Sequence, residues 1–198
     1  MTDKDKRLKS IRDRVLNLKE SPLYEYRVAN HYFPVIGEGN HDAKIVFIGE
    51  APGKNEAETA RPFCGAAGKV LDKLLATVGI DRKDVYVSNI VKDRPPDNRD
   101  PTPSEIELYS PFLIEQLEII QPKVIATLGR FSMKFILEQL NVPEQTQSIS
   151  ILHGRLLSGK LSFGDVKVLA LYHPAVALYN GNTYNTLEKD FQALKQFI

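Results

Sequence analysis

The sequence predicts a three-layer α/β/α sandwich, in which helices cover both faces of a central, mainly parallel sheet of about four strands. One observation behind this prediction is that short, β-branched apolar runs recur along the chain, each of a length typical of a buried strand. The other is that segments with apolar residues at helical spacing separate these runs, which favours parallel strands joined by helices. The four predicted strands are residues 43–49, 84–89, 123–129 and 167–172.

The helices follow from the same pattern, taken in order. Residues 3–19 carry an apolar stripe at helical spacing and predict an amphipathic helix, whereas residues 21–40 are rich in proline, glycine and aromatics and predict no regular element. A second helix is predicted over residues 65–78, after the first strand, and another over residues 130–140, after the third strand.

Proline dominates the segment after the second strand. Residues 92–103 (KDRPPDNRDPTP) hold four prolines and are predicted to be irregular. Thr102 or Ser104 is expected to cap the next helix, which runs to about Ile120 and begins with Glu105 in an acidic first turn.

The C-terminal part is expected to contribute a hairpin and a helix besides the fourth strand. Residues 156–163 predict a short hairpin around Ser158-Gly159. A last helix is predicted over residues 186–197.

Composition limits the function classes. The 198 residues, 42% hydrophobic and 26% charged, fit one domain (residues 1–198) with a sizeable core. A net charge of +1 gives no global attraction to nucleic acid, so a DNA contact must come from local charge. The single cysteine, Cys64, excludes an internal disulfide, and no Cys/His set has zinc spacing, so no metal is predicted. The charged N-terminus and the lack of a long apolar run lead us to expect a soluble, cytoplasmic protein without a membrane partner.

Polar groups follow the predicted strands. Glu50 comes after the first, Asn89 ends the second, Gly129-Arg130 follow the third, and His173 follows the fourth. Because ligands bind beyond the carboxyl ends of parallel strands, we expect these side chains to form a site.

The set of side chains restricts the chemistry of this site. One carboxylate, one imidazole and one amide make a poor metal shell, and neither a Gly-x-Ser-x-Gly nucleophile turn nor a phosphate-binding loop is present. A carboxylate, an imidazole and an amide suit cleavage of a bond to a recognised heterocycle. The carboxylate directs water to a cationic sugar, the imidazole stabilises the departing anion, and the amide reads the base.

Three successive motifs carry a resemblance to a known family. They are GEAPGKNEAETARPFCGAAGKVLDKLL, SNIVKDRPPDNRDPTPSEI and HPAVALY, and the match around them runs from about Gly37 to Tyr179. In order and spacing this composite resembles the family 4 uracil-DNA glycosylases. The resemblance implies a monofunctional enzyme of base excision repair that flips uracil out of DNA and hydrolyses its N-glycosidic bond.

The resemblance also implies roles for the matching residues. Glu50 is similar to the carboxylate that positions the attacking water and stabilises positive charge on the deoxyribose. Ala51 would offer its backbone N–H to uracil, and Phe63 would stack on the flipped base. Asn89 would pair with the O4/N3 edge, and His173 would donate to O2. Glu56 matches an acidic position of the family and is expected to support substrate binding.

Further segments are expected to contact DNA. Lys92, Arg94 and Arg99 lie on the proline-stiffened loop, where they are predicted to hold phosphates. Leu178, in the apolar run after His173-Pro174, is predicted to fill the hole left by the flipped base.

The sequence departs from the family at the cysteines that ligate a four-iron four-sulphur cluster. Leu18, Ser21, Asp93 and Tyr109 occupy those four positions, so no cofactor is expected. We expect apolar and hydrogen-bonded packing to replace the cluster, with Asp93 next to an arginine. A related branch traps the abasic sugar through a histidine in the proline-rich loop; this loop has none, so ordinary turnover is expected. The resemblance also implies a monomer, because most such enzymes are monomers.

Two alternatives stay open. One is a glycosylase for another deaminated base such as hypoxanthine, against which the Glu50 and Asn89 pair argues. The other is a catalytically silent DNA- or protein-binding relative, against which the complete set of catalytic-type residues argues. Singly, each residue also has a structural explanation: His173 as a strand end, Glu50 as a turn cap, Phe63 as core and Asn89 as a turn former.

Overall fold

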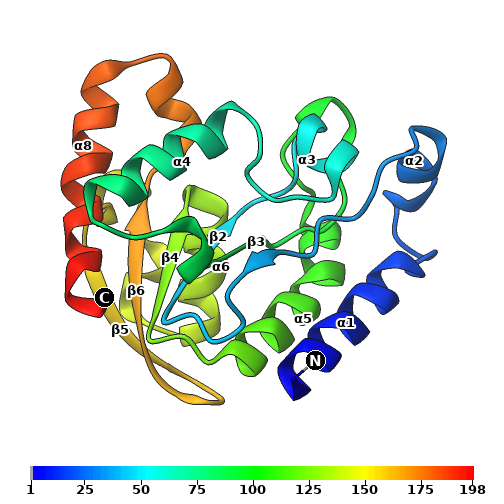
Figure 1. Cartoon of the computed structure of the whole chain (residues 1–198), viewed down its shortest axis with the longest axis horizontal. Helices are drawn as coiled ribbons and strands as arrows, with labels where there is room; N and C mark the ends of the chain where they lie inside the picture. Colours follow the sequence, from blue (N-terminus) through cyan, green and yellow to red (C-terminus); the bar gives the residue numbers. More distant parts are fainter. Residues whose placement is uncertain (1) are drawn as a thin grey trace.

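A six-stranded sheet lies between two layers of helices in the computed structural model, which describes residues 2–198 (Figure 1). The strand order is β1-β3-β2-β4-β6-β5, and the four inner strands are parallel. These four correspond to the four predicted strands, so the predicted fold class is confirmed. The strands are β1 (Glu38–Gly39), β2 (Ile45–Gly49), β3 (Tyr86–Asn89), β4 (Val124–Leu128), β5 (Leu156–Leu161) and β6 (Gly164–Leu171).

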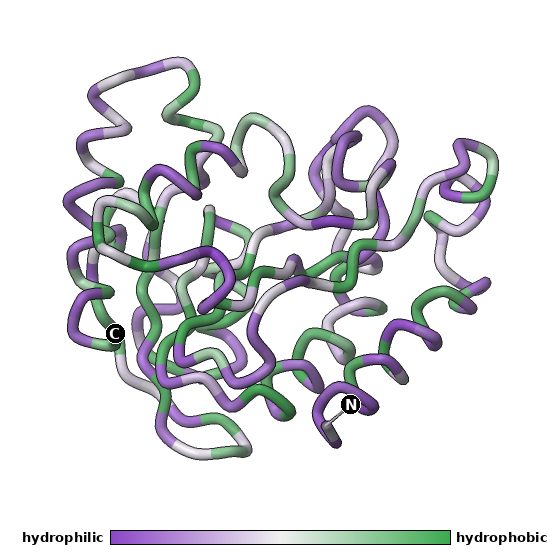
Figure 2. Tube along the Cα trace, viewed as in Figure 1, coloured by the Kyte–Doolittle hydropathy of each residue, from purple (hydrophilic) through white to green (hydrophobic). Residues whose placement is uncertain are grey.

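Alternate side chains of the inner strands enter two separate cores, one on each face of the sheet. Phe47 of β2 packs with Leu74 in one helix and stacks on Phe191 in another, with ring centroids 5.9 Å apart. Its neighbour Ile48 points to the other face and packs with Ile136. Hydropathy along the chain follows this arrangement, with apolar strands inside and polar outer helix surfaces (Figure 2). The two layers are formed by α4 (Ala66–Thr77) and α8 (Gly181–Phe191) on one face, and α5 (Pro103–Ile120) and α6 (Arg130–Leu140) on the other.

The sheet has two antiparallel edges that the sequence did not predict correctly. β1 is a two-residue strand within a segment expected to be irregular. At the other edge, Ser158 and Gly159 lie inside β5 and pair with β6, so the predicted turn at these residues is wrong. The chain turns instead at residues 162–163, where the following Gly164 adopts φ +127°, a conformation that favours glycine.

Helix ends agree with local sequence signals where a cap is present. Thr102 caps α5, with Glu105 completing a reciprocal capping box. Asn180 caps α8, which therefore begins earlier than predicted; its last predicted residues form the 3₁₀ helix η5 (Gln192–Phe197). Three helices of four to six residues were not predicted, because they are too short to show an apolar period. They are α2 (Tyr24–Ala29), α3 (Lys54–Thr59) and α7 (Ile149–Leu152).

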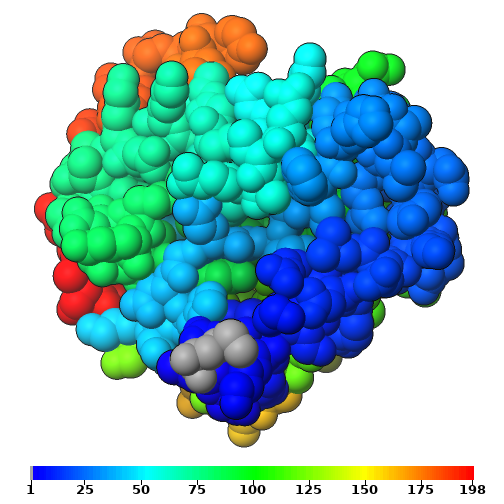
Figure 3. Space-filling view, turned by 45° about the vertical axis from the view of Figure 1, so that its right-hand side comes forward, coloured from blue at the N-terminus to red at the C-terminus, as the bar shows by residue number. Residues whose placement is uncertain are grey.

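The N-terminal segment packs beside α5, and it is coloured blue in Figure 3. Its helix α1 (Asp3–Leu16) packs on α5 through a third, smaller apolar cluster that contains Leu18 and Tyr109. No helix among residues 2–198 is long and apolar enough to cross a membrane.

A chain of buried hydrogen bonds ties this segment to the rest of the protein. Ser21 Oγ lies 2.7 Å from the Tyr109 hydroxyl, which donates to Asp93 Oδ2 over 2.5 Å. Arg27 binds both carboxylate oxygens of Asp93 and also donates to the carbonyls of residues 15 and 16, at the end of α1. Asp93 therefore has the arginine partner, and Tyr109 the buried packing, that the sequence predicted for this region.

Candidate active site

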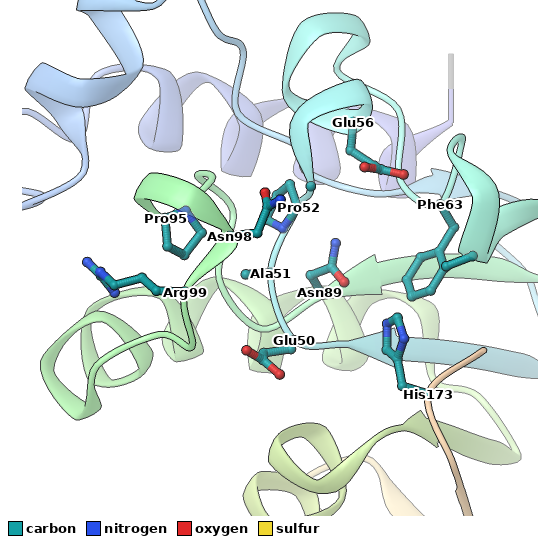
Figure 4. A pocket seen from close by; sticks show the side chains of 12 residues that line it. Glu50, Ala51, Pro52, Glu56, Phe63, Asn89, Pro95, Asn98, Arg99 and His173 are labelled. Carbon is teal, nitrogen blue, oxygen red and sulfur yellow. The ribbon is translucent and has the colours of Figure 1, made fainter. Parts of the chain in front are cut away.

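The residues that follow β2, β3 and β6 meet at one edge of the sheet and enclose a cavity of about 190 Å³ (Figure 4). The lining includes seven residues that the sequence singled out: Glu50, Ala51, Glu56, Phe63, Asn89, Arg99 and His173. It also includes Pro52, Gly53, Ala67, Pro95 and Asn98, which were not predicted. The rule that parallel strands deliver ligand-binding groups to one edge therefore holds for three of the four inner strands, whereas Gly129 and Arg130, which follow β4, do not line the cavity.

Asn89 ends β3 with its side chain buried against the cavity. Its Oδ1 atom accepts no hydrogen bond, and it is the one buried side-chain polar atom of residues 2–198 left without a partner. A buried acceptor without a donor is costly, so its presence at a cavity indicates a ligand that donates a hydrogen bond there.

Phe63 is fixed in an unusual backbone conformation beside Asn89. Its φ of +49° is rare for a bulky residue and stores strain. The backbone of Phe63 packs directly against Gly68 of α4, where a Cβ atom would lie only 1.7 Å from the Phe63 carbonyl oxygen. The Phe63 ring lies 5.6 Å from the His173 ring, centroid to centroid, and both rings line the cavity. The strained loop thus presents an aromatic face at a defined place.

His173 is a neutral hydrogen-bond donor at this site. Burial lowers its pKa to about 4, so the imidazole is uncharged near pH 7. Its Nδ1 atom accepts the Ala175 backbone N–H over 3.2 Å, at the start of the 3₁₀ helix η4 (Pro174–Leu178). Because Nδ1 accepts, the single ring proton is on Nε2, which is therefore the atom that can donate to a ligand.

Glu50 is a carboxylate that titrates near neutrality. Burial raises its pKa to about 7, repulsion from Asp100 adds to the rise, and attraction to Arg130 opposes it. The residue accepts no hydrogen bond from another side chain among residues 2–198. A half-buried carboxyl with such a pKa suits proton exchange with a water molecule.

Glu56 positions the loop that carries Phe63. Its Oε1 atom accepts the backbone N–H groups of Cys64 and Gly65, at 3.1 and 2.9 Å. The carboxylate thus links α3 to the start of α4 through the residues that follow Phe63. These contacts make it a support for the cavity wall, consistent with its expected supporting role.

Ala51 leaves its backbone N–H free at the cavity. The carbonyls of Gly49 and Glu50 accept from Ile90 and Val91, which extends the β2–β3 pairing past the strand ends. Within residues 2–198, however, no backbone or side-chain acceptor receives the Ala51 N–H. This donor is available to a ligand.

The structure corrects the predicted phosphate contact of Lys92. Its side chain has no exposed surface, because the ammonium points into the core and donates to Ser88, Gln116 and the Asn89 carbonyl. A charge in this position cannot reach a DNA phosphate, so the prediction is wrong.

The other predicted DNA contacts lie at the surface around the cavity. Arg94 is half-buried and binds only neutral oxygens, on Asn98, Tyr32 and Tyr26. Arg99 lines the cavity but is paired with Glu105, with Nη2 and Oε1 2.6 Å apart. Leu178 is exposed at the end of η4, five residues after His173.

Asn98 is the main lining residue that the sequence analysis missed. It and Asp97 both adopt left-handed conformations, with φ +52° and +55°, in the turn after the paired prolines. Two successive non-glycine residues in this region indicate strain, which is concentrated at functional sites. The only sequence signal was asparagine itself, the residue that tolerates this conformation best after glycine.

Comparisons with known proteins agree with this geometry. Residues 36–195 match the model of the uracil DNA glycosylase superfamily. The chain is 42% identical over 190 residues to a type-4 uracil-DNA glycosylase of Sulfurisphaera tokodaii, covering 96% of this chain and 84% of the relative. It is 44% identical over 169 residues to that of Archaeoglobus fulgidus, covering 85% and 83%. It is 38% identical over 202 residues to that of Thermotoga maritima, covering 100% and 98%.

Proposed function

The chain belongs to the uracil DNA glycosylase superfamily, and on that premise we propose that it removes uracil from DNA by hydrolysing the N-glycosidic bond. The observation that carries the choice of base is the orphaned Asn89 Oδ1. An amide oxygen there accepts N3–H of uracil while the amide nitrogen donates to O4. Cytosine presents the inverse pattern at this edge and would leave buried groups unpaired.

Binding of the flipped base uses the remaining groups of the cavity. Phe63 offers an aromatic face on which a base stacks, and the free Ala51 N–H offers a backbone donor. His173 Nε2–H donates to uracil O2. Because the imidazole is neutral, this hydrogen bond strengthens as negative charge develops on O2 and does not depend on a titration near pH 7.

The bond is cleaved by water. The C1′–N1 bond breaks, its electron pair stays on uracil, and positive charge develops on the deoxyribose. Ionised Glu50 stabilises that charge and accepts a proton as a water molecule adds to C1′. The products are an abasic site and a uracil anion that takes up a proton from solvent.

We further propose that the chain works without an iron–sulphur cluster. The four positions where the resembling family has cysteine ligands hold a leucine, a serine, an aspartate and a tyrosine, which supply no thiolate. Three of the four, Ser21, Asp93 and Tyr109, are already engaged in hydrogen bonds with one another. Iron analysis of the purified protein tests this: no iron is expected, and stoichiometric iron would contradict it.

Contacts with the DNA backbone are assigned to Arg94 and Arg99, and the wedge to Leu178. We propose that the chain acts on DNA as a monomer. We also propose that it is a single domain that acts in the cytoplasm.

Strand cleavage by alkali after incubation with labelled oligonucleotides tests the function. One oligonucleotide carries a single uracil, and matched ones carry hypoxanthine, thymine or cytosine. Cleavage at uracil alone is expected. Cleavage at hypoxanthine instead would show that the substrate is another deaminated base. If the folded protein binds the DNA but cleaves none of the oligonucleotides, it is a catalytically silent relative.

A further inference from the structure

Lys92 is a buried ammonium that has no carboxylate partner. Its side chain is fully buried, and Nζ donates only to neutral oxygens. They are Gln116 Oε1 at 2.6 Å, the Asn89 carbonyl at 2.7 Å, Ser88 Oγ at 2.8 Å and the Ile36 carbonyl at 3.4 Å. Burial of a lone charge is costly, and it lowers the pKa of this lysine to about 7. An apolar side chain of similar length would avoid the cost of the buried charge, but it would leave the Asn89 carbonyl and Gln116 Oε1 without the donor that they have now.

The charges that line the cavity do not suit a departing anion. Glu50 and Glu56 are carboxylates, and Arg99 is held by Glu105. His173 is neutral at pH 7. Among the cavity-lining residues, all of which the structure describes, no cation is therefore unpaired. A uracil that leaves with the electron pair of its glycosidic bond needs positive potential from elsewhere.

Lys92 lies immediately behind the residue that reads the base. Its ammonium donates to the backbone carbonyl of Asn89, and the side chain of the same Asn89 lines the cavity. It also binds Ser88 Oγ, one residue earlier in β3, and Gln116 of α5. These contacts fix the end of β3 from within the core, where a charge is screened little by water.

We infer that Lys92 is a positioning residue for the proposed reaction: it holds the backbone of Asn89 and supplies a fixed positive charge behind the base, which stabilises the anion as uracil departs. The protonated form of the lysine, which predominates below its pKa of about 7, has this role. It gives up no proton in the reaction, and it touches neither the base nor the water. This inference rests on the proposed glycosylase function and adds a residue that acts through Asn89.

The dependence on the leaving group separates this role from a structural one. Fluorine at C5 of uracil withdraws electrons and stabilises the N1 anion, so 5-fluorouracil needs less help from the protein. In single-turnover assays with saturating enzyme, Lys92→Met should slow uracil release about tenfold or more, equivalent to about 1.4 kcal/mol. It should slow 5-fluorouracil release clearly less. A purely structural loss would slow both bases by the same factor.

Two further variants complete the test. Gln116→Glu keeps the lysine but sets a carboxylate against it, so it should reproduce the selective loss on uracil even if Lys92→Met fails to fold. Thr127→Val removes a buried hydroxyl elsewhere in the sheet and should affect both bases alike. An equal loss on uracil and 5-fluorouracil in the folded variants would overturn the inference. A wild-type protein that cleaves neither base would instead contradict the proposed function itself.

Discussion

A Cβ atom added to Gly49 would lie only 2.3 Å from Asn89 Oδ1 and 2.8 Å from the Phe63 ring. Real Cβ atoms do not approach other atoms so closely, so residue 49 must be glycine for the base-reading amide and the aromatic face to occupy their present places. Gly49 ends β2, and Asn89 lies opposite it at the end of β3. The register of these two strands therefore builds the base pocket.

Replacement of Gly49 by alanine should displace both Asn89 and Phe63. We expect Gly49→Ala to lower the single-turnover rate on uracil DNA by about 100-fold, since misplacement by about 1 Å has effects of this size. Gly181→Ala is the matched control, because a Cβ there meets nothing within 4 Å, and it should keep the wild-type rate. A fully active Gly49→Ala variant would contradict the proposed pocket.

Activity should rise with pH as Glu50 ionises. Its pKa is raised to about 7, so ionisation of Glu50 should raise the rate from about pH 6, and loss of the Lys92 charge above about pH 7 should lower the rate again. Glu50→Gln should be at least about 100-fold slower, because the charge and the proton acceptor are lost. Rates measured across this pH range check both points, and a fast Glu50→Gln enzyme would exclude the assigned role.

The same residue should make the folded state less stable as pH rises. A carboxyl whose pKa is higher when folded than when unfolded contributes stability that is fully present below about pH 4.5 and lost as pH rises through about 7. The Tm of Glu50→Gln should therefore exceed that of the wild type by more at pH 8 than at pH 5. An equal difference at both pH values would show that folding does not raise the pKa of Glu50.

His173 should remain neutral and carry its proton on Nε2. Burial lowers its pKa to about 4, and Nδ1 accepts the Ala175 N–H. Nitrogen NMR of the imidazole ring between pH 5.5 and 8 should show one neutral tautomer without titration. A midpoint near the ordinary value of about 6.5, or a proton on Nδ1, would contradict the proposed hydrogen bond to O2.

Arg27 should be important for stability rather than for chemistry. Arg27→Met leaves Asp93 buried without its ion pair and should lower the free energy of unfolding by about 3 kcal/mol. Arg12→Met, which breaks an exposed pair with Asp13, should change it by less than about 0.5 kcal/mol. Urea unfolding measures both values. Equal effects would show that the buried Arg27–Asp93 pair contributes no more to the free energy of unfolding than an exposed pair does.

The fold could be predicted from sequence largely because its signals are local. Apolar runs mark the four inner strands, and the threonine and glutamate of the capping box mark the start of α5. The site was found because parallel strands end at one edge, which makes Glu50, Asn89 and His173 neighbours although they are far apart in the chain.

What could not be predicted depends on distant partners. Lys92 looked like a solvated loop charge, but the oxygens that receive it come from β3 and from Gln116, 24 residues away in α5. Asn98 lines the cavity because the chain adopts left-handed conformations at Asp97 and Asn98. Their residue types tolerate this conformation but do not require it, so it could not be predicted. The antiparallel edge hairpin was placed wrongly because Ser158-Gly159 carries the same turn residues as the true turn region.

The most direct measurement is mass spectrometry of the products from a single-uracil oligonucleotide under single-turnover conditions. We predict one free uracil released per strand by the wild type, with the remaining strand intact and carrying one abasic site, and a strong loss of release by Asn89→Ala. Intact substrate recovered from a folded protein that binds the DNA, or uracil release unaffected by Asn89→Ala, would contradict the account.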